Sequence, residues 1–176
     1  MAMNLEQIRI DFVPEHDRLL MRIASGERSE ILLWLTRRCV KLLWPLLVKM
    51  TESVPHIAQQ ALPEARQALL GMEREQALAK ANFSRKYDAA GREHPLGAEP
   101  MLVTRINTGR NESGTHVHEM LPQLGQGVTL AIDDTLLHGL CKLVQDVAGK
   151  AEWDLVLALP TGPTGAGVDG VPRVLN

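Results

Sequence analysis

Residues 31–50 read ILLWLTRRCVKLLWPLLVKM, and the pattern of this segment changes at Thr36. Apolar residues alternate before Thr36, which is typical of a buried strand, and recur at helical spacing after it. The alternating residues are Ile31, Leu33 and Leu35, and the helically spaced residues are Val40, Leu43 and Leu47. Thr36 is a good N-cap, so the segment predicts a strand that runs directly into a helix.

The same order of patterns returns 97 residues later along the chain. Val128, Leu130 and Ile132 alternate as a second strand, and Asp133 takes the place of Thr36 as the cap. The apolar face of the second helix then consists of Leu137, Leu140 and Val144. Matching patterns at a fixed offset are the mark of an internal repeat.

Each strand–helix unit is preceded by two further segments of strand character. In the first half these are residues 5–12 and 18–23, and in the second they are residues 101–107 and 115–121. The predicted class is therefore α+β, with two pseudo-repeated halves of about three antiparallel strands plus one helix. The halves span residues 1–53 and 101–153, and we expect them to share one core.

A helical linker and a loop fill residues 54–100 between the halves. Good helix formers dominate residues 57–81, where Pro63 either interrupts the first turns or starts the main helix. Residues 84–87 suggest a short strand, and residues 88–100 a loop. Residues 154–176 open with a strand-like run and continue as a Gly/Pro-rich tail that we expect to be loosely held.

The bulk composition excludes several classes of protein. The chain has 176 residues, a net charge of −2 and 45% hydrophobic residues, as expected for an ordinary globular protein. Residues 31–50 carry too many charges for a membrane span, and the first residues do not resemble a secretion signal. Cys39 and Cys141 lie among apolar residues, so we predict buried thiols and a cytoplasmic location.

The first helix has more apolar surface than one sheet can cover. Its polar residues form a narrow stripe, whereas Leu42, Trp44, Leu46 and Met50 add to the apolar surface. The second cover is either the helix at 57–81 or another subunit. We therefore predict a non-catalytic protein that acts by protein–protein association through these four residues and without a cofactor, and we expect the partner to be a second copy of the chain before another protein.

Two other functions have candidate residues. Single-stranded nucleic-acid binding would use Phe83, Arg85, Lys86 and Tyr87, because such surfaces combine stacking rings with basic groups.

A metal-dependent enzyme would use His116 and His118, which share a strand face, together with His138 on the second helix. The pattern fits surface or cross-strand histidines better than a metal site, with His138 on the solvent side of its helix. Asp133 and Asp134 fit helix capping better than acid–base catalysis.

Two further segments carry a resemblance to a known family. They are RLLMR at residues 18–22 followed by LWLTRR at residues 33–38, and GVTL at residues 127–130 followed by LLH at 136–138 and AEW at 151–153. With these, the chain resembles a family of small bacterial proteins with no known activity over most of residues 5–154. The resemblance implies a bacterial cytoplasmic protein and no particular mechanism.

Overall fold

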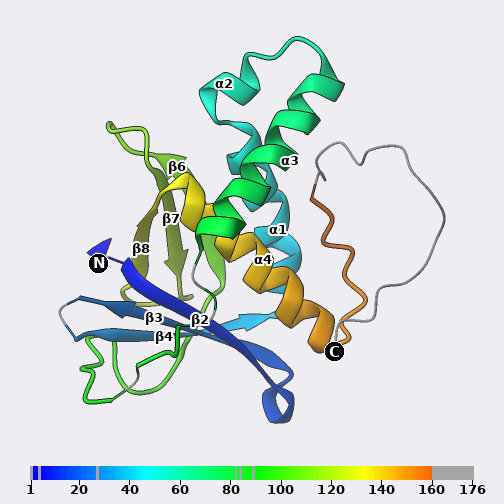
Figure 1. Ribbon diagram of the computed structural model, residues 1–176. Helices are drawn as coiled ribbons and strands as arrows, with labels where there is room; N and C mark the ends of the chain where they lie inside the picture. The colour runs from blue at the N-terminus through cyan, green and yellow to red at the C-terminus, as the bar shows by residue number, and fades with distance from the viewer. Residues whose placement is uncertain are drawn as a thin grey trace.

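In the part of the chain that the structure describes, two four-stranded sheets and four helices make up the fold, which is α+β as predicted. The computed structural model describes residues 2–159 except 4, 27, 82, 84 and 89. The strands are β1 Ala2–Met3, β2 Leu5–Val13, β3 Arg18–Ser25, β4 Glu30–Thr36, β5 Met101–Leu102, β6 Arg105–Arg110, β7 His116–Leu121 and β8 Val128–Ile132. The helices are α1 Arg37–Glu52, α2 Pro55–Ala58, α3 Pro63–Lys80 and α4 Asp134–Lys150, and a short 3-10 turn covers Pro14–His16. Figure 1 shows α4 crossing α1 beside the sheets, with α2 and the start of α3 projecting away from them.

Each sheet is an antiparallel meander completed by a strand from the other half. One sheet has the order β2-β3-β4-β5 and the other the order β1-β8-β7-β6. The short strands β5 and β1 pair in parallel with β4 and β8 respectively, so each half contributes one edge strand to the sheet of the other. The β3–β4 pair sets Leu19 opposite Leu35, and the β7–β8 pair sets His116 opposite Ile132.

The strand–cap–helix segments agree with the prediction. The Thr36 side chain accepts a hydrogen bond from the Cys39 amide at 3.1 Å, and Asp133 accepts one from the Leu136 amide at 2.7 Å. Each side chain therefore accepts a hydrogen bond from a first-turn backbone amide that has no partner within its helix.

The prediction of a single strand at residues 101–107 is wrong. Residues 101–102 belong to β5, whereas β6 begins at Arg105 in the other sheet. The chain crosses between the sheets here: the Val103 amide donates to the Trp34 carbonyl and the Thr104 amide to the Leu121 carbonyl. The alternation of apolar residues does not show which sheet accepts each backbone hydrogen bond. The pattern therefore predicted one strand where there are two.

The connecting region also differs from its prediction. Pro63 begins the main helix α3, which is one of the two outcomes expected for this proline, but a separate short helix, α2, precedes it. The described residues of 84–87 form no strand. The run 154–159 is extended but lies outside both sheets, and the rest of the Gly/Pro-rich tail, 160–176, lies outside the described residues.

The second cover of α1 comes from α4 and from the segment after it. α1 packs against α4, and Leu155, Leu157 and Leu159 pack on the same core cluster. The helix proposed as this cover, α3, packs on α4 instead, where Arg74 donates to the Gln145 side chain at 2.9 Å. Among the described residues, no helix is both long and apolar enough to cross a bilayer.

Gly127, just before β8, provides a test of how closely the chain packs against β7 at this point. A Cβ there would lie 2.4 Å from the Met120 carbonyl oxygen, which is backbone and cannot move aside. We expect Gly127→Ala to lower the free energy of unfolding by about 1–3 kcal/mol, the range for overpacking. A Cβ at Gly109 meets nothing within 4 Å. Gly109→Ala should therefore change the stability by less than about 0.5 kcal/mol in the same urea titration, and equal losses would contradict this account.

Candidate functional site

The four predicted interface residues of α1 divide into two pairs. Trp44 and Met50 are each only 6% exposed, so their own chain covers them and their assignment to an open interface is wrong. Leu42 is 56% exposed and Leu46 is half-buried. The sequence showed the excess of apolar surface but not that α4 and residues 154–159 cover half of it.

Leu42 and Leu46 lie on a groove between α1 and β6. Its volume is about 280 Å³, and its lining consists of Cys39, Leu42, Leu46, Thr104, Arg105 and Ile106. β6 is the last strand of its sheet and, among the described residues, pairs only with β7. An apolar groove therefore lies beside a strand edge with free backbone groups. The β6 residues were missed, because nothing in the sequence places β6 next to α1.

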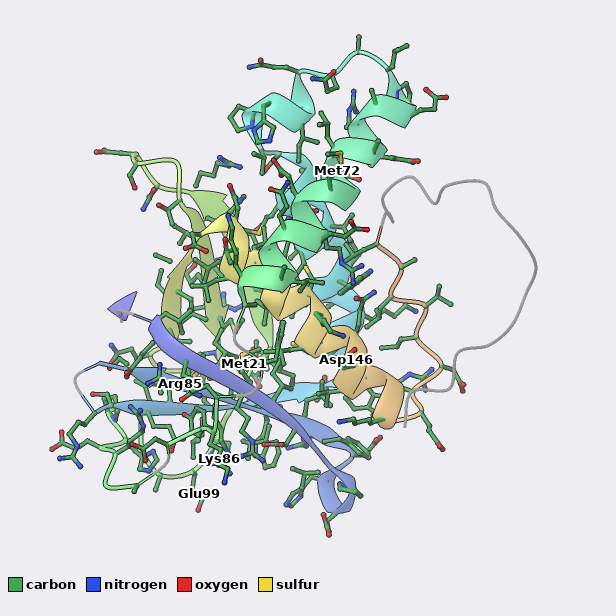
Figure 2. The ribbon with its side chains drawn as sticks, in the orientation of Figure 1. Met21, Met72, Arg85, Lys86, Glu99 and Asp146 are labelled. Carbon is green, nitrogen blue, oxygen red and sulfur yellow. The ribbon has the colours of Figure 1, made fainter. Side chains whose placement is uncertain are left out.

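A groove at the matching place of the other half, between α4 and β2, contains part of this chain. Phe83 and Arg85 line it together with Gln7, Leu136 and Leu143. The Gln7 side chain donates to the carbonyl of Lys86 at 3.2 Å, which ties the segment to β2. In Figure 2, Arg85 and Lys86 lie beside β2. Phe83, Arg85 and Lys86 thus lie beside this strand and helix, where a side-chain hydrogen bond, and no strand pairing among the described residues, holds them.

The four residues proposed for nucleic-acid binding do lie together, on a cavity of about 370 Å³. Their polar groups are engaged within the chain: the Tyr87 hydroxyl donates to buried Glu30 at 2.7 Å, and Arg85 lies 3.5 Å from Glu6. Asp11 also lines the cavity. The cluster therefore fixes this segment to the first half and does not form a continuous basic stacking surface.

His116 and His118 share a face of β7, as predicted, but it is the buried face. They are 1% and 0% exposed, so the expectation of surface histidines is wrong. His116 Nε2 lies 2.7 Å from Asp134 Oδ1 at the start of α4. Neither ring nitrogen of His118 has a hydrogen-bond partner among the described residues. Burial, reinforced by neighbouring His116, lowers the pKa of His118 to about 4, so its ring is neutral at pH 7.

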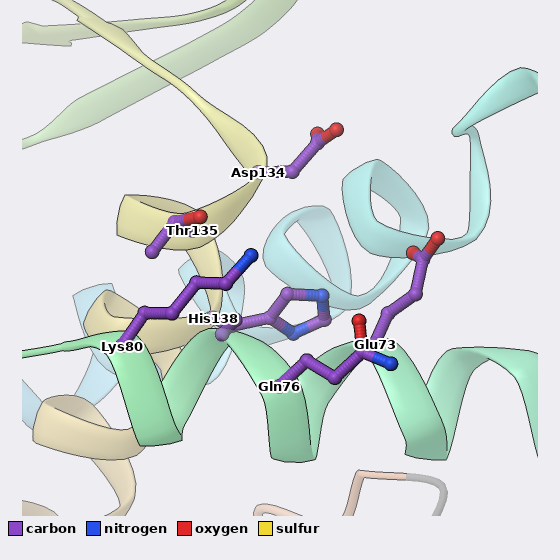
Figure 3. Close-up of a pocket in the computed structure, with 7 residues that line it drawn as sticks. Glu73, Gln76, Lys80, Asp134, Thr135 and His138 are labelled. Carbon is purple, nitrogen blue, oxygen red and sulfur yellow. The ribbon is translucent and has the colours of Figure 1, made fainter.

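His138 is buried too, at 2% exposed, because α3 covers the face of α4 that was expected to meet solvent. It lines a cavity of about 150 Å³ together with Glu73, Lys80, Asp134 and Thr135. Figure 3 shows its ring between α3 and α4. Burial lowers the pKa of His138, and its Nδ1 has no hydrogen-bond partner in the described part of the chain.

The three histidines do not form a metal site in this arrangement. Within residues 2–159, where described, no three His, Cys, Asp or Glu side chains are grouped so that they could hold a metal ion. Cys39 and Cys141 are buried free thiols, as predicted. Burial raises the pKa of Cys39 to about 11 and that of Cys141 to about 12, so neither is a ready nucleophile.

Comparison of the chain with protein-family models, with curated proteins and with solved structures finds no match. The resemblance to a family of small bacterial proteins therefore stays a prediction.

His118 should make the fold sensitive to acid. Its pKa is about 4 in the folded protein and about 6.5 in an unfolded chain, so the unfolded state binds the extra proton between these values. The stability should fall as the pH drops from about 6.5 to 4, by up to roughly 3 kcal/mol. His118→Met removes this loss, and Met21 shows that methionine fits the matching face of β3.

Urea unfolding between pH 7 and pH 4 measures the effect. Met120→Leu, on the same buried face, is the control, because it leaves His118 in place and should retain the acid sensitivity. The account fails if His118→Met and Met120→Leu lose stability equally over this range.

Proposed function

We propose that the protein acts by binding an extended, acidic segment of another polypeptide in the groove between α1 and β6. The observation that carries this proposal is Leu42, which is 56% exposed on a groove also lined by Leu46 and Ile106. Apolar side chains gathered at a groove are typical of a recognition surface.

The neighbouring strand edge supports an extended partner. A segment that pairs with β6 would gain backbone hydrogen bonds and direct alternate side chains into the groove. At the corresponding place in the other half, Phe83 lines a groove between β2 and α4, and the Gln7 side chain of β2 donates to the carbonyl of Lys86. The fold therefore already places residues from outside the sheets beside the strand edge of the other half.

The charges at the groove support an acidic partner. Arg105 lines it, and Lys49 lies one turn beyond Leu46 on α1. Neither cation has an ion pair or side-chain hydrogen bond among the described residues. Antiparallel pairing of β6 with a second copy over its full length would set Arg105 opposite Arg110, which is unfavourable. The charges thus favour a different polypeptide over self-association.

We also propose that the two halves are copies of one β-β-β-α unit. Supporting this, Leu19 pairs with Leu35 and His116 pairs with Ile132. His116 lies 97 residues after Leu19, and Ile132 lies 97 residues after Leu35. The caps Thr36 and Asp133 keep the same offset. The two buried free thiols support a cytoplasmic location, where thiols stay reduced.

Fluorescently labelled synthetic peptides test the docking site. A peptide that alternates glutamate with leucine should bind the full chain and protect the Ile106 and Thr108 amides from hydrogen exchange, whereas a lysine–leucine peptide should not. Leu42→Asp should weaken binding at least about tenfold, because it places a carboxylate in the groove beside the incoming carboxylates, a loss of about 1.4 kcal/mol.

Leu124→Asp is the matched control, because Leu124 is 88% exposed and lies between β7 and β8. It should leave the affinity unchanged. Equal weakening by both variants, or no acidic-peptide binding at millimolar concentration, would contradict the proposal. A dimer in light scattering that Leu42→Asp dissociates would assign the groove to a second copy and also overturn it.

A further inference from the structure

A cavity of about 810 Å³ lies on another face of α1, between the start of this helix and the segment that follows α4. The α1 residues on its lining are Arg37, Arg38, Lys41, Trp44 and Pro45, and residues 154–157 form the opposite wall. This volume falls within the usual range of small-molecule sites, about 300–1,000 Å³.

Three cations line this cavity without partners. Arg37, Arg38 and Lys41 are exposed, and none has a hydrogen bond or ion pair among the described residues. They lie at the positive end of the helix dipole, and the first turn contains no acidic residue. Among the residues that the structure describes, Asp154 is the only carboxylate on the lining. The three positive charges therefore repel one another and destabilise the start of α1.

The fold does not require positive charge at this place. Counted from its N-cap, α4 has Asp134, Thr135 and His138 where α1 has the three cations. Figure 3 shows these three residues on the small cavity beneath α3. The start of α4 thus has the acidic residue that favours a helix N-terminus, and the start of α1 has the reverse.

The opposite wall of the cavity is held in place. Trp153 Nε1 donates to Asp17 Oδ1 at 2.6 Å, and its ring packs edge-on against Phe12. Glu152 and Asp154, on either side of Trp153, have φ of 52° and 53°, which turns the chain back along α1. Gln145 donates to the Leu157 carbonyl. The cavity is therefore formed in the free protein.

We propose that this cavity binds an organic phosphate. Two guanidinium groups and one ammonium group match the charge and the oxygen geometry of a phosphate better than those of a single carboxylate. The space exceeds the needs of inorganic phosphate, and Trp44, Pro45, Leu155 and Leu157 offer apolar contacts to the rest of the ligand. This site is separate from the peptide groove, which uses Leu42 and Leu46 on a different face of α1.

Isothermal titration calorimetry of the full chain tests the proposal with inorganic phosphate, phenyl phosphate, ADP and a short-chain phosphatidic acid below its micelle concentration. At least one organic phosphate should bind about tenfold more tightly than inorganic phosphate, and its affinity should fall as salt is added. The probe that binds best distinguishes an aryl phosphate, a nucleotide and a lipid headgroup as the source.

Arg37→Asp places at the start of α1 the residue type that begins α4, so it should keep or raise the melting temperature while weakening binding at least about tenfold. Lys142→Glu makes the same charge change on α4 outside the cavity and should leave the affinity unaltered. Arg38→Thr is a second cavity variant that should also weaken binding. Absence of binding by every organic probe, equal binding of inorganic phosphate, or equal effects of Arg37→Asp and Lys142→Glu would overturn the proposal.

Discussion

The contact between α1 and α4 is the constraint on which the rest of the structure depends. α1 is apolar on more sides than its own sheet covers, so it can be buried only if the second half supplies another surface. α4 and residues 154–159 supply that surface, and one core cluster includes Leu43 and Leu47 together with Leu140 and Val144. The exchange of β1 and β5 between the sheets has the same basis, because each half completes the other. Neither half can bury its helix alone.

The two halves have corresponding surfaces, but different segments of the chain lie on them. Beside α4 and β2, Phe83 lines the groove, the Gln7 side chain donates to the carbonyl of Lys86, and Tyr87 is bonded to Glu30. Beside α1 and β6, no described segment does the same. The connecting region after the first half supplies the covering segment, whereas the segment after α4 forms the wall that packs on α1. The asymmetry therefore arises from the different segments that come after α1 and α4, and not from the β-β-β-α order itself.

Local patterns predicted most elements, because strand alternation, helical spacing and capping act within a few residues. Thr36 and Asp133 begin their helices as predicted, and both cysteines are buried. The errors concern contacts between distant segments. Residues 101–107 divide between two sheets because their hydrogen-bond partners are Trp34 and Leu121, which the local pattern does not contain. His138 is buried because α3 packs over it, and half of the predicted interface is covered for a similar reason. Side-chain chemistry is readable from sequence, but exposure is a tertiary property.

Two linked differences between the halves explain why positive charge is concentrated at the start of α1. On the buried faces, His116 of β7 takes the place that Leu19 has in β3, each opposite the last apolar residue of the next strand. In the second half, the residue that starts the helix, Asp134, bonds this histidine at 2.7 Å. In the first half, apolar Leu19 offers no partner to Arg37, the residue that starts α1. The carboxylate of α4 is therefore occupied in stabilising a buried polar ring, whereas the guanidinium of α1 has no such structural role. A cation at the positive end of a helix is destabilising unless an anion balances it, and Arg37 has no partner among the described residues, so this difference supports the proposed phosphate site.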